Sequence, residues 1–105
     1  MDRIKEKDFE NAVLNCKDMP VIVDFSADWC MPCKNLAKIF EELSVIYATR
    51  AKFVNCDAEE CQTLTNEYGV MNLPSVFIFK NGEVVDKFVG AMSKAKIIDK
   101  IEKFL

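Results

Sequence analysis

The chain has 105 residues, half of them hydrophobic and 30% charged, which predicts one globular domain, 1–105, with a buried core. A net charge of −3 without a basic stripe argues against nucleic-acid binding, and no apolar run reaches the roughly 20 residues that span a bilayer. The charged N-terminal segment lacks the apolar core of a signal peptide, so we expect a cytoplasmic protein whose five cysteines are catalytic, metal-binding or buried.

The first part of the chain predicts a strand, a helix and a second strand. A short segment around Ile4 is interpreted as an edge strand, and Asp8 as the N-cap of a helix that carries Phe9 and Val13. Residues 21–25 form a β-branched apolar run that is typical of a strand buried on both faces.

The middle of the chain predicts two helices on either side of a strand at residues 53–56. Asp57 opens a pattern that resembles a capping box, for a helix that ends near Gly69. The earlier helix is indicated by apolar residues that recur at helical spacing over about four turns: Leu36, Ile39, Phe40, Leu43, Ile46 and Tyr47.

The last part predicts a hairpin and a final helix. Residues 75–79 and 84–89 are the predicted strands, and Asn81 with Gly82 is a strong hairpin signal between them. Ser93 is the expected N-cap of the final helix. Because strands separated by helices pair in parallel and a hairpin adds antiparallel strands, we predict an α/β fold. Its central mixed sheet has about five strands flanked by four helices.

Cys30 and Cys33 lie two residues apart, between the buried strand and the long helix. Disulfide exchange needs a thiolate, and free N–H groups at the start of a helix lower a thiol pKa. We therefore assign Cys30 the attack on a substrate disulfide, and Cys33 the resolution of the mixed disulfide. The alternative is half of a zinc site. However, the chain has no histidine, and Cys16, Cys56 and Cys61 do not repeat the spacing.

Asp24 is a carboxylate within an otherwise apolar predicted strand. An ionised, unpaired carboxylate costs several kcal/mol to bury, so we expect desolvation to raise the Asp24 pKa toward neutrality. Its place next to the cysteine helix makes it the expected proton acceptor for the Cys33 thiol. An exposed aspartate on an edge strand is the alternative.

Several short motifs occur together in this chain: Asp24-Phe25, Trp29-Cys30, Pro32-Cys33-Lys34, Leu73-Pro74, Lys80-Asn81-Gly82-Glu83 and Gly90-Ala91. In this combination the chain resembles the thioredoxin family over nearly its full length. The resemblance implies the thioredoxin fold and a protein-disulfide reductase with no bound cofactor, which receives its electrons from a thioredoxin reductase. It also implies a cis peptide bond before Pro74, although the sequence alone fits an ordinary trans proline equally well.

The same resemblance implies an apolar docking rim around Cys30, formed by Trp29, Met31, Leu73, Val89, Gly90 and Ala91. Such a surface suits protein substrates that are recognised through their backbone. Simple core packing is the alternative for each apolar member. A protein of this kind is expected to be a monomer.

Four residues depart from the usual pattern of the family. Met31 stands where Gly is usual, and it is expected to alter both substrate fit and redox potential. Lys38 replaces a helix-kinking Pro, so the helix is expected to be straighter, and Ser26 replaces a common Trp. Phe53 falls where many members have a Lys that pairs with the buried Asp. Without that Lys, the Asp24 pKa should rise further unless another cation substitutes.

The remaining cysteines are interpreted mainly as structural. Cys56 is expected to be a small buried hydrophobe, and Cys16 a structural thiol near a helix end. Cys61 lies in the first turn of a predicted helix, where exposure and a lowered pKa would allow glutathionylation or intermolecular pairing. An inert Cys61 is nevertheless the favoured interpretation.

Three functions compete at this stage. The leading hypothesis is a reductase that acts on disulfide-containing protein substrates. A binding or chaperone-like module would use the same apolar rim, but binding alone requires neither thiol. A protein-disulfide oxidase or isomerase would differ in redox potential, and the expected cytoplasmic location favours a reductant.

Overall fold

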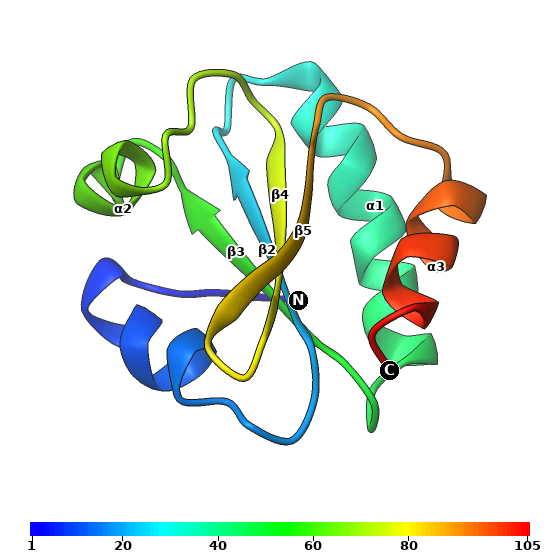
Figure 1. The fold of residues 1–105 in the computed structure, drawn as a ribbon. Helices are drawn as coiled ribbons and strands as arrows, with labels where there is room; N and C mark the ends of the chain where they lie inside the picture. The colour runs from blue at the N-terminus through cyan, green and yellow to red at the C-terminus, as the bar shows by residue number, and fades with distance from the viewer.

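The computed structural model describes residues 1–105 and contains a five-stranded mixed sheet between two layers of helices (Figure 1). In spatial order the strands are β1 (Asp2–Arg3), β3 (Lys52–Asp57), β2 (Val21–Ser26), β4 (Ser75–Lys80) and β5 (Glu83–Val89). The strands β1, β3 and β2 run parallel to one another, whereas β4 is antiparallel to β2 and β5 is antiparallel to β4. The predicted α/β fold with a mixed sheet is therefore confirmed.

Helices cover both faces of the sheet. On one face lie α1 (Met31–Ile46) and α3 (Lys94–Glu102), and on the other lie α2 (Gln62–Glu67) and two N-terminal helical turns (Figure 1). The central strand β2 is buried along its whole length, as predicted. Its side chains alternate between two core clusters, with Ile22 on the α1 side and Val23 on the α2 side.

The apolar stripe of α1 is the one predicted, except at its last turn. Leu36, Phe40 and Leu43 are buried against the sheet, and Tyr47 follows them at helical spacing. Ile46 was expected in this stripe, but it is exposed. Successive helical residues differ by about 100° in direction, so Ile46 faces solvent when Tyr47 faces the core.

The N-terminal helix differs from its prediction. A 3₁₀ turn (η1, Glu6–Asp8) is followed by a π-helical segment (η2, Glu10–Leu14), and Asp8 lies inside the first turn instead of capping a helix. A segment this short is only marginally helical by itself, so tertiary packing decides its path. That packing buries Phe9 and Val13 in the core cluster on the α2 side.

The helix predicted from Asp57 begins later, at Gln62. Asp57 is the last residue of β3, and its carboxylate accepts a hydrogen bond from the backbone N–H of Glu59 at 2.9 Å. This contact closes a turn that precedes α2, so the capping-box interpretation was wrong. The predicted end of the helix is confirmed, because Gly69 follows the C-cap with a φ of +65°.

The hairpin and the last helix match their predictions. Asn81 and Gly82 both have positive φ and join β4 to β5, as a two-residue turn requires. The Ser93 hydroxyl accepts a hydrogen bond from the backbone N–H of Lys96 at 3.3 Å, which caps α3. None of the helices combines the length and apolar character that crossing a membrane requires.

Candidate active site

Cys30 and Cys33 form a disulfide at the beginning of α1. Cys30 is the N-cap and Cys33 lies in the first turn, with 5.2 Å between their Cα atoms. The backbone N–H of Cys33 donates a hydrogen bond to the Cys30 sulfur at 3.3 Å. Pro32 suits this first turn because a helix leaves the N–H groups there without a partner. In the reduced protein, the Cys33 N–H and the helix dipole would both favour a thiolate at Cys30.

Both cysteines are buried, and they are packed in a small cluster with Ala27. Leu73 from the loop before β4 packs against this cluster. The structure therefore places one predicted rim residue directly against the cysteine pair.

Asp24 is completely buried in the middle of β2, so the alternative of an exposed edge-strand aspartate is wrong. The side-chain amide of Asn55 donates a hydrogen bond to its Oδ2 at 3.2 Å, whereas its Oδ1 has no partner. Burial raises the Asp24 pKa to about 7, against opposing effects of the Asn55 hydrogen bond and of the Arg3 charge. The expected rise of this pKa is therefore confirmed.

Asn55, and not Phe53, is the residue that faces Asp24. In the parallel pairing of β2 with β3, Asp24 lies opposite Asn55 and Ile22 lies opposite Phe53. Phe53 packs on Phe40 of α1, with 5.9 Å between their ring centroids. Phe53 and Asn55 lie two residues apart on the same face of β3, so the register places the Asn55 amide, and no lysine, directly beside Asp24.

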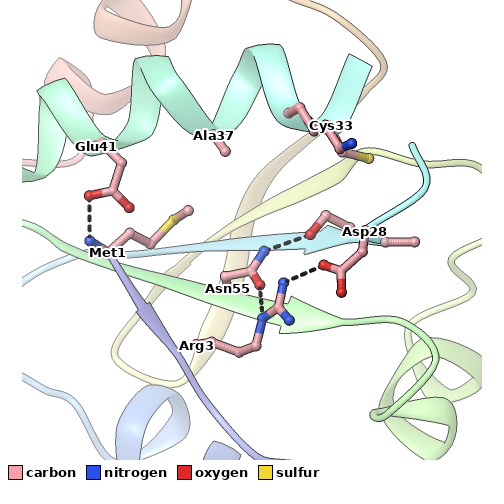
Figure 2. A pocket seen from close by; sticks show the side chains of 10 residues that line it. Met1, Arg3, Asp28, Cys33, Ala37, Glu41 and Asn55 are labelled. Carbon is pink, nitrogen blue, oxygen red and sulfur yellow. Dashed lines mark hydrogen bonds and ion pairs between the residues drawn. The ribbon is translucent and has the colours of Figure 1, made fainter. Parts of the chain in front are cut away.

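A pocket of about 470 Å³ lies between α1 and the strands β1 to β3. Figure 2 shows Cys33 on the α1 side of this pocket and Asn55 and Arg3 on the sheet side. Ser26 also lines it, and its hydroxyl accepts a hydrogen bond from the Asn55 amide at 2.7 Å. The pocket thus joins Cys33 to the amide that binds Asp24. Neither Asn55 nor Arg3 was identified from the sequence, because only the strand pairing brings them here.

The peptide bond between Leu73 and Pro74 is cis, as the family resemblance implied. The carbonyl oxygen of Pro74 accepts a hydrogen bond from the backbone N–H of Gly90 at 2.8 Å, and Val89 pairs with Ser75. Two segments of the predicted rim are therefore joined side by side.

Four apolar members of the rim are exposed, whereas Leu73 is half-buried. Trp29 and Met31 are 71% and 64% exposed, and Val89 and Ala91 also face solvent. The Trp29 indole N–H donates a hydrogen bond to the Glu59 carboxylate, which attaches the ring to the loop after β3. Core packing is therefore excluded for these four apolar residues.

Met71 belongs to the same surface and was missed. It is 90% exposed, and it lines one pocket with Trp29 and Leu73 and a second pocket with Val89. An exposed apolar side chain in the loop before Leu73-Pro74 was the available signal, but no periodicity marks a loop residue. Met71 therefore links the two halves of the rim.

The other three cysteines are free thiols. Cys56 and Cys61 are completely buried in the cluster on the α2 side, and burial raises the pKa of both thiols. The exposure and lowered pKa that a regulatory Cys61 would need are therefore absent. Cys16 is half-buried, and its sulfur contacts the carbonyl oxygen of Met19 at 3.8 Å. No cluster of three His, Cys, Asp or Glu side chains is arranged to hold a metal ion.

Comparisons with known proteins agree with this geometry. The family model for thioredoxin matches residues 1–103. Thioredoxin C-2 of Corynebacterium nephridii is 41% identical over 92 residues, which cover 88% of this chain and 84% of that protein. Thioredoxin of Rickettsia typhi is 38% identical over 103 residues, covering 98% and 97%. The chloroplastic M-type thioredoxin of Chlamydomonas reinhardtii is 34% identical over 102 residues, covering 97% and 72%.

A matching family model, similar relatives and a disulfide at the start of α1 lead to one conclusion. The chain belongs to the thioredoxin family, and it is a thiol–disulfide oxidoreductase that reduces protein disulfides through Cys30 and Cys33.

Proposed function

We propose that Cys30 is the nucleophile, Cys33 the resolving thiol and Asp24 the proton acceptor of a cytoplasmic protein-disulfide reductase. The protein would work as a monomer without a bound cofactor. One observation carries this proposal: a carboxyl group with a pKa of about 7 is hydrogen-bonded to Asn55, which lines the same pocket as Cys33. A group with this pKa can accept and release a proton near neutral pH.

In the first step, the Cys30 thiolate attacks one sulfur of the substrate disulfide. A mixed disulfide forms, and the other substrate sulfur leaves as a thiolate. The hydrogen bond from the Cys33 N–H to the Cys30 sulfur and the start of α1 support this role, because both stabilise negative charge on Cys30.

In the second step, Cys33 transfers its proton to the Asp24 carboxylate and attacks the Cys30 sulfur. The bond from Cys30 to the substrate breaks, the second substrate sulfur leaves, and two electrons have passed to the substrate. A water molecule takes up about 30 Å³ of liquid volume, so the pocket of about 470 Å³ has room for water between Cys33 and Asn55, whose amide binds Asp24.

Substrate recognition is assigned to the rim around the cysteines. Trp29, Met31, Leu73 and Val89 supply apolar contacts, and Gly90 and Ala91 supply backbone beside Pro74, whose carbonyl accepts the Gly90 hydrogen bond. An exposed surface of this kind favours a protein chain over a small molecule as the substrate.

The cytoplasmic location and the electron donor belong to the same proposal. Three free thiols, two of them buried, suit a reducing compartment. A thioredoxin reductase would return the Cys30–Cys33 disulfide to the dithiol. Incubation of the oxidised protein with a purified thioredoxin reductase and its electron source should release two thiols per chain, and no release would contradict this donor.

Reduction of insulin by dithiothreitol, followed as turbidity, tests the cysteine roles. The wild type should accelerate the reaction, and Cys30→Ser should be inactive. In a separate reaction without dithiothreitol, reduced Cys33→Ser should form a mixed disulfide with insulin that persists until dithiothreitol is added. A Cys30→Ser variant that keeps its activity would overturn the assignment. Full cellular complementation by Cys30→Ser/Cys33→Ser would instead favour a binding module.

The role of Asp24 is tested by the lifetime of the mixed disulfide. General base catalysis typically contributes about 10²-fold or more, so Asp24→Asn should slow release of reduced insulin at pH 7 by at least about tenfold. Formation of the mixed disulfide should be affected less, because that step needs no proton from Cys33. Equal effects on both steps would contradict Asp24 as the proton acceptor.

A further inference from the structure

Arg3, on the edge strand β1, is connected to the buried carboxylate of Asp24 by two consecutive hydrogen bonds. The Arg3 Nε–H donates to Asn55 Oδ1 at 3.0 Å, and Asn55 Nδ2 donates to Asp24 Oδ2 at 3.2 Å. Figure 2 shows the first of these contacts among the residues that line the pocket. The strand register explains it, because Arg3 lies opposite Asn55 in the parallel pairing of β1 with β3.

The hydrogen bond from Arg3 determines which way the Asn55 amide points. An amide has one acceptor side and one donor side, and Arg3 can only donate. Since Arg3 binds the oxygen, the NH₂ group faces inward, where it also donates to the Ser26 hydroxyl and to the Asp24 carbonyl oxygen. If the amide were reversed, its oxygen would face the Asp24 carboxylate and repel the charged form.

We propose that Arg3 is a positioning residue for the dithiol–disulfide reaction: it orients the Asn55 amide toward Asp24 and supplies a positive charge two hydrogen bonds away from this carboxylate. The inference rests on the proposed role of Asp24 as the proton acceptor. It assigns a function to a partly exposed residue of a two-residue edge strand, which would otherwise be a surface ion pair.

Other charged groups face the pocket and modulate this effect. The guanidinium of Arg3 is held by Asp28 at 3.0 Å and by Asp57 at 3.5 Å, and Asp28 lines the pocket together with Arg3. The amino group of Met1 is neutralised by Glu41 at 3.0 Å.

On α1, the pocket is also lined by Lys34. From β4, the residue opposite Asp24 is the apolar Val76. Arg3 is thus the cation connected to Asp24 through hydrogen bonds, and its charge lowers the Asp24 pKa against the effect of burial.

Titration of the Asp24 carboxyl carbon by NMR in the oxidised protein tests the proposal independently of activity, since the disulfide cysteines do not titrate. Arg3→Gln should raise the Asp24 pKa by roughly half a unit to one unit, because a cation near a carboxylate favours the charged form. Arg3→Lys keeps the positive charge, so the Asp24 pKa in this variant should stay close to its wild-type value. The chain's other arginine provides the matched control: Arg50→Gln, beyond the far end of α1, should leave the pKa unchanged.

The direction of the shift separates this role from a merely structural one. A loosened site would admit water to Asp24 and lower its pKa, whereas loss of the Arg3 charge should raise it. An unchanged or lowered pKa in Arg3→Gln would overturn the inference.

The proposed function is tested separately by the resolution step, in which Cys33 displaces the substrate. In Arg3→Gln, the pH midpoint of its rate should move upward together with the pKa. If the pKa rises while this midpoint stays, the inference on Arg3 holds and the proton-acceptor role of Asp24 fails.

Discussion

The side-chain amide of Asn55 donates the hydrogen bond that the Asp24 carboxylate accepts at Oδ2, and Oδ1 of the same carboxylate has no partner. A buried, ionised carboxylate is stable only when several donors surround it. With one neutral side-chain donor, the protonated form is favoured up to a pH of about 7. This pair therefore adjusts a carboxyl group to exchange protons near neutral pH.

The pH dependence of stability should report this carboxyl group. Folding raises the Asp24 pKa from its ordinary value of 3.8 to about 7, so the native state binds the proton more tightly than the unfolded state. The stability from this proton is fully present below a pH of about 4, and it is lost as the pH rises through 7. A shift of this size corresponds to at most about 4 kcal/mol.

Urea unfolding of the oxidised wild type and of Asp24→Asn between pH 4 and pH 8 measures this effect. The free energy of unfolding of the wild type should fall with rising pH relative to the variant, which lacks the titrating group. Parallel curves for the two proteins would show that Asp24 titrates normally in the native state.

Met71 should contribute to substrate binding without contributing to stability. It links the Trp29 side of the rim to the Val89 side, and 90% of its surface is exposed. We expect Met71→Ala to raise the KM for insulin by about three- to tenfold while kcat changes little. Val45 is also a highly exposed apolar residue, near the far end of α1, and Val45→Ala should leave both constants unchanged. A similar KM for both variants would remove Met71 from the rim.

Gly82 should be required by the β4–β5 hairpin for two reasons. Its φ is +81°, and a Cβ at this position would lie 2.8 Å from the backbone oxygen of Leu14. Gly82→Ala should therefore destabilise the protein by roughly 2–3 kcal/mol, measured by chemical denaturation. Gly69 also has a positive φ, but the space around it is open, so Gly69→Ala should lower the free energy of unfolding by only about 1 kcal/mol. Equal losses for both variants would show that the contact with Leu14 is unimportant.

The cysteine thiols should differ in reactivity, because the start of α1 favours the Cys30 thiolate and burial sets the order of the three free cysteines. After selective reduction of the active-site disulfide, iodoacetamide at neutral pH should label Cys30 first, because its thiolate is favoured at the start of α1. Half-buried Cys16 should follow slowly, while Cys56 and Cys61 should react only after unfolding. Mass spectrometry of tryptic peptides resolves these sites. Rapid native-state labelling of Cys61 would contradict its burial.

Local patterns in the sequence were sufficient for the main elements of the fold. The β-branched run of β2, the stripe of Leu36, Phe40 and Leu43, and the hairpin at Asn81 and Gly82 each follow from periodicity or from turn geometry. These features depend on neighbours along the chain. The failures lie at Asp8 and Asp57, where a capping residue was inferred but packing or strand pairing decided the path.

The sequence by itself determined the chemistry of this protein, because two cysteines at the start of a helix and an aspartate in an apolar strand are visible as local patterns. Only the tertiary structure decided which residues adjust that chemistry. Asn55 faces Asp24 through the register of β2 with β3, and Arg3 reaches Asn55 from a strand that is distant in sequence. Strand register and loop packing are non-local, so no pattern of neighbouring residues identifies Arg3, Asn55 or Met71.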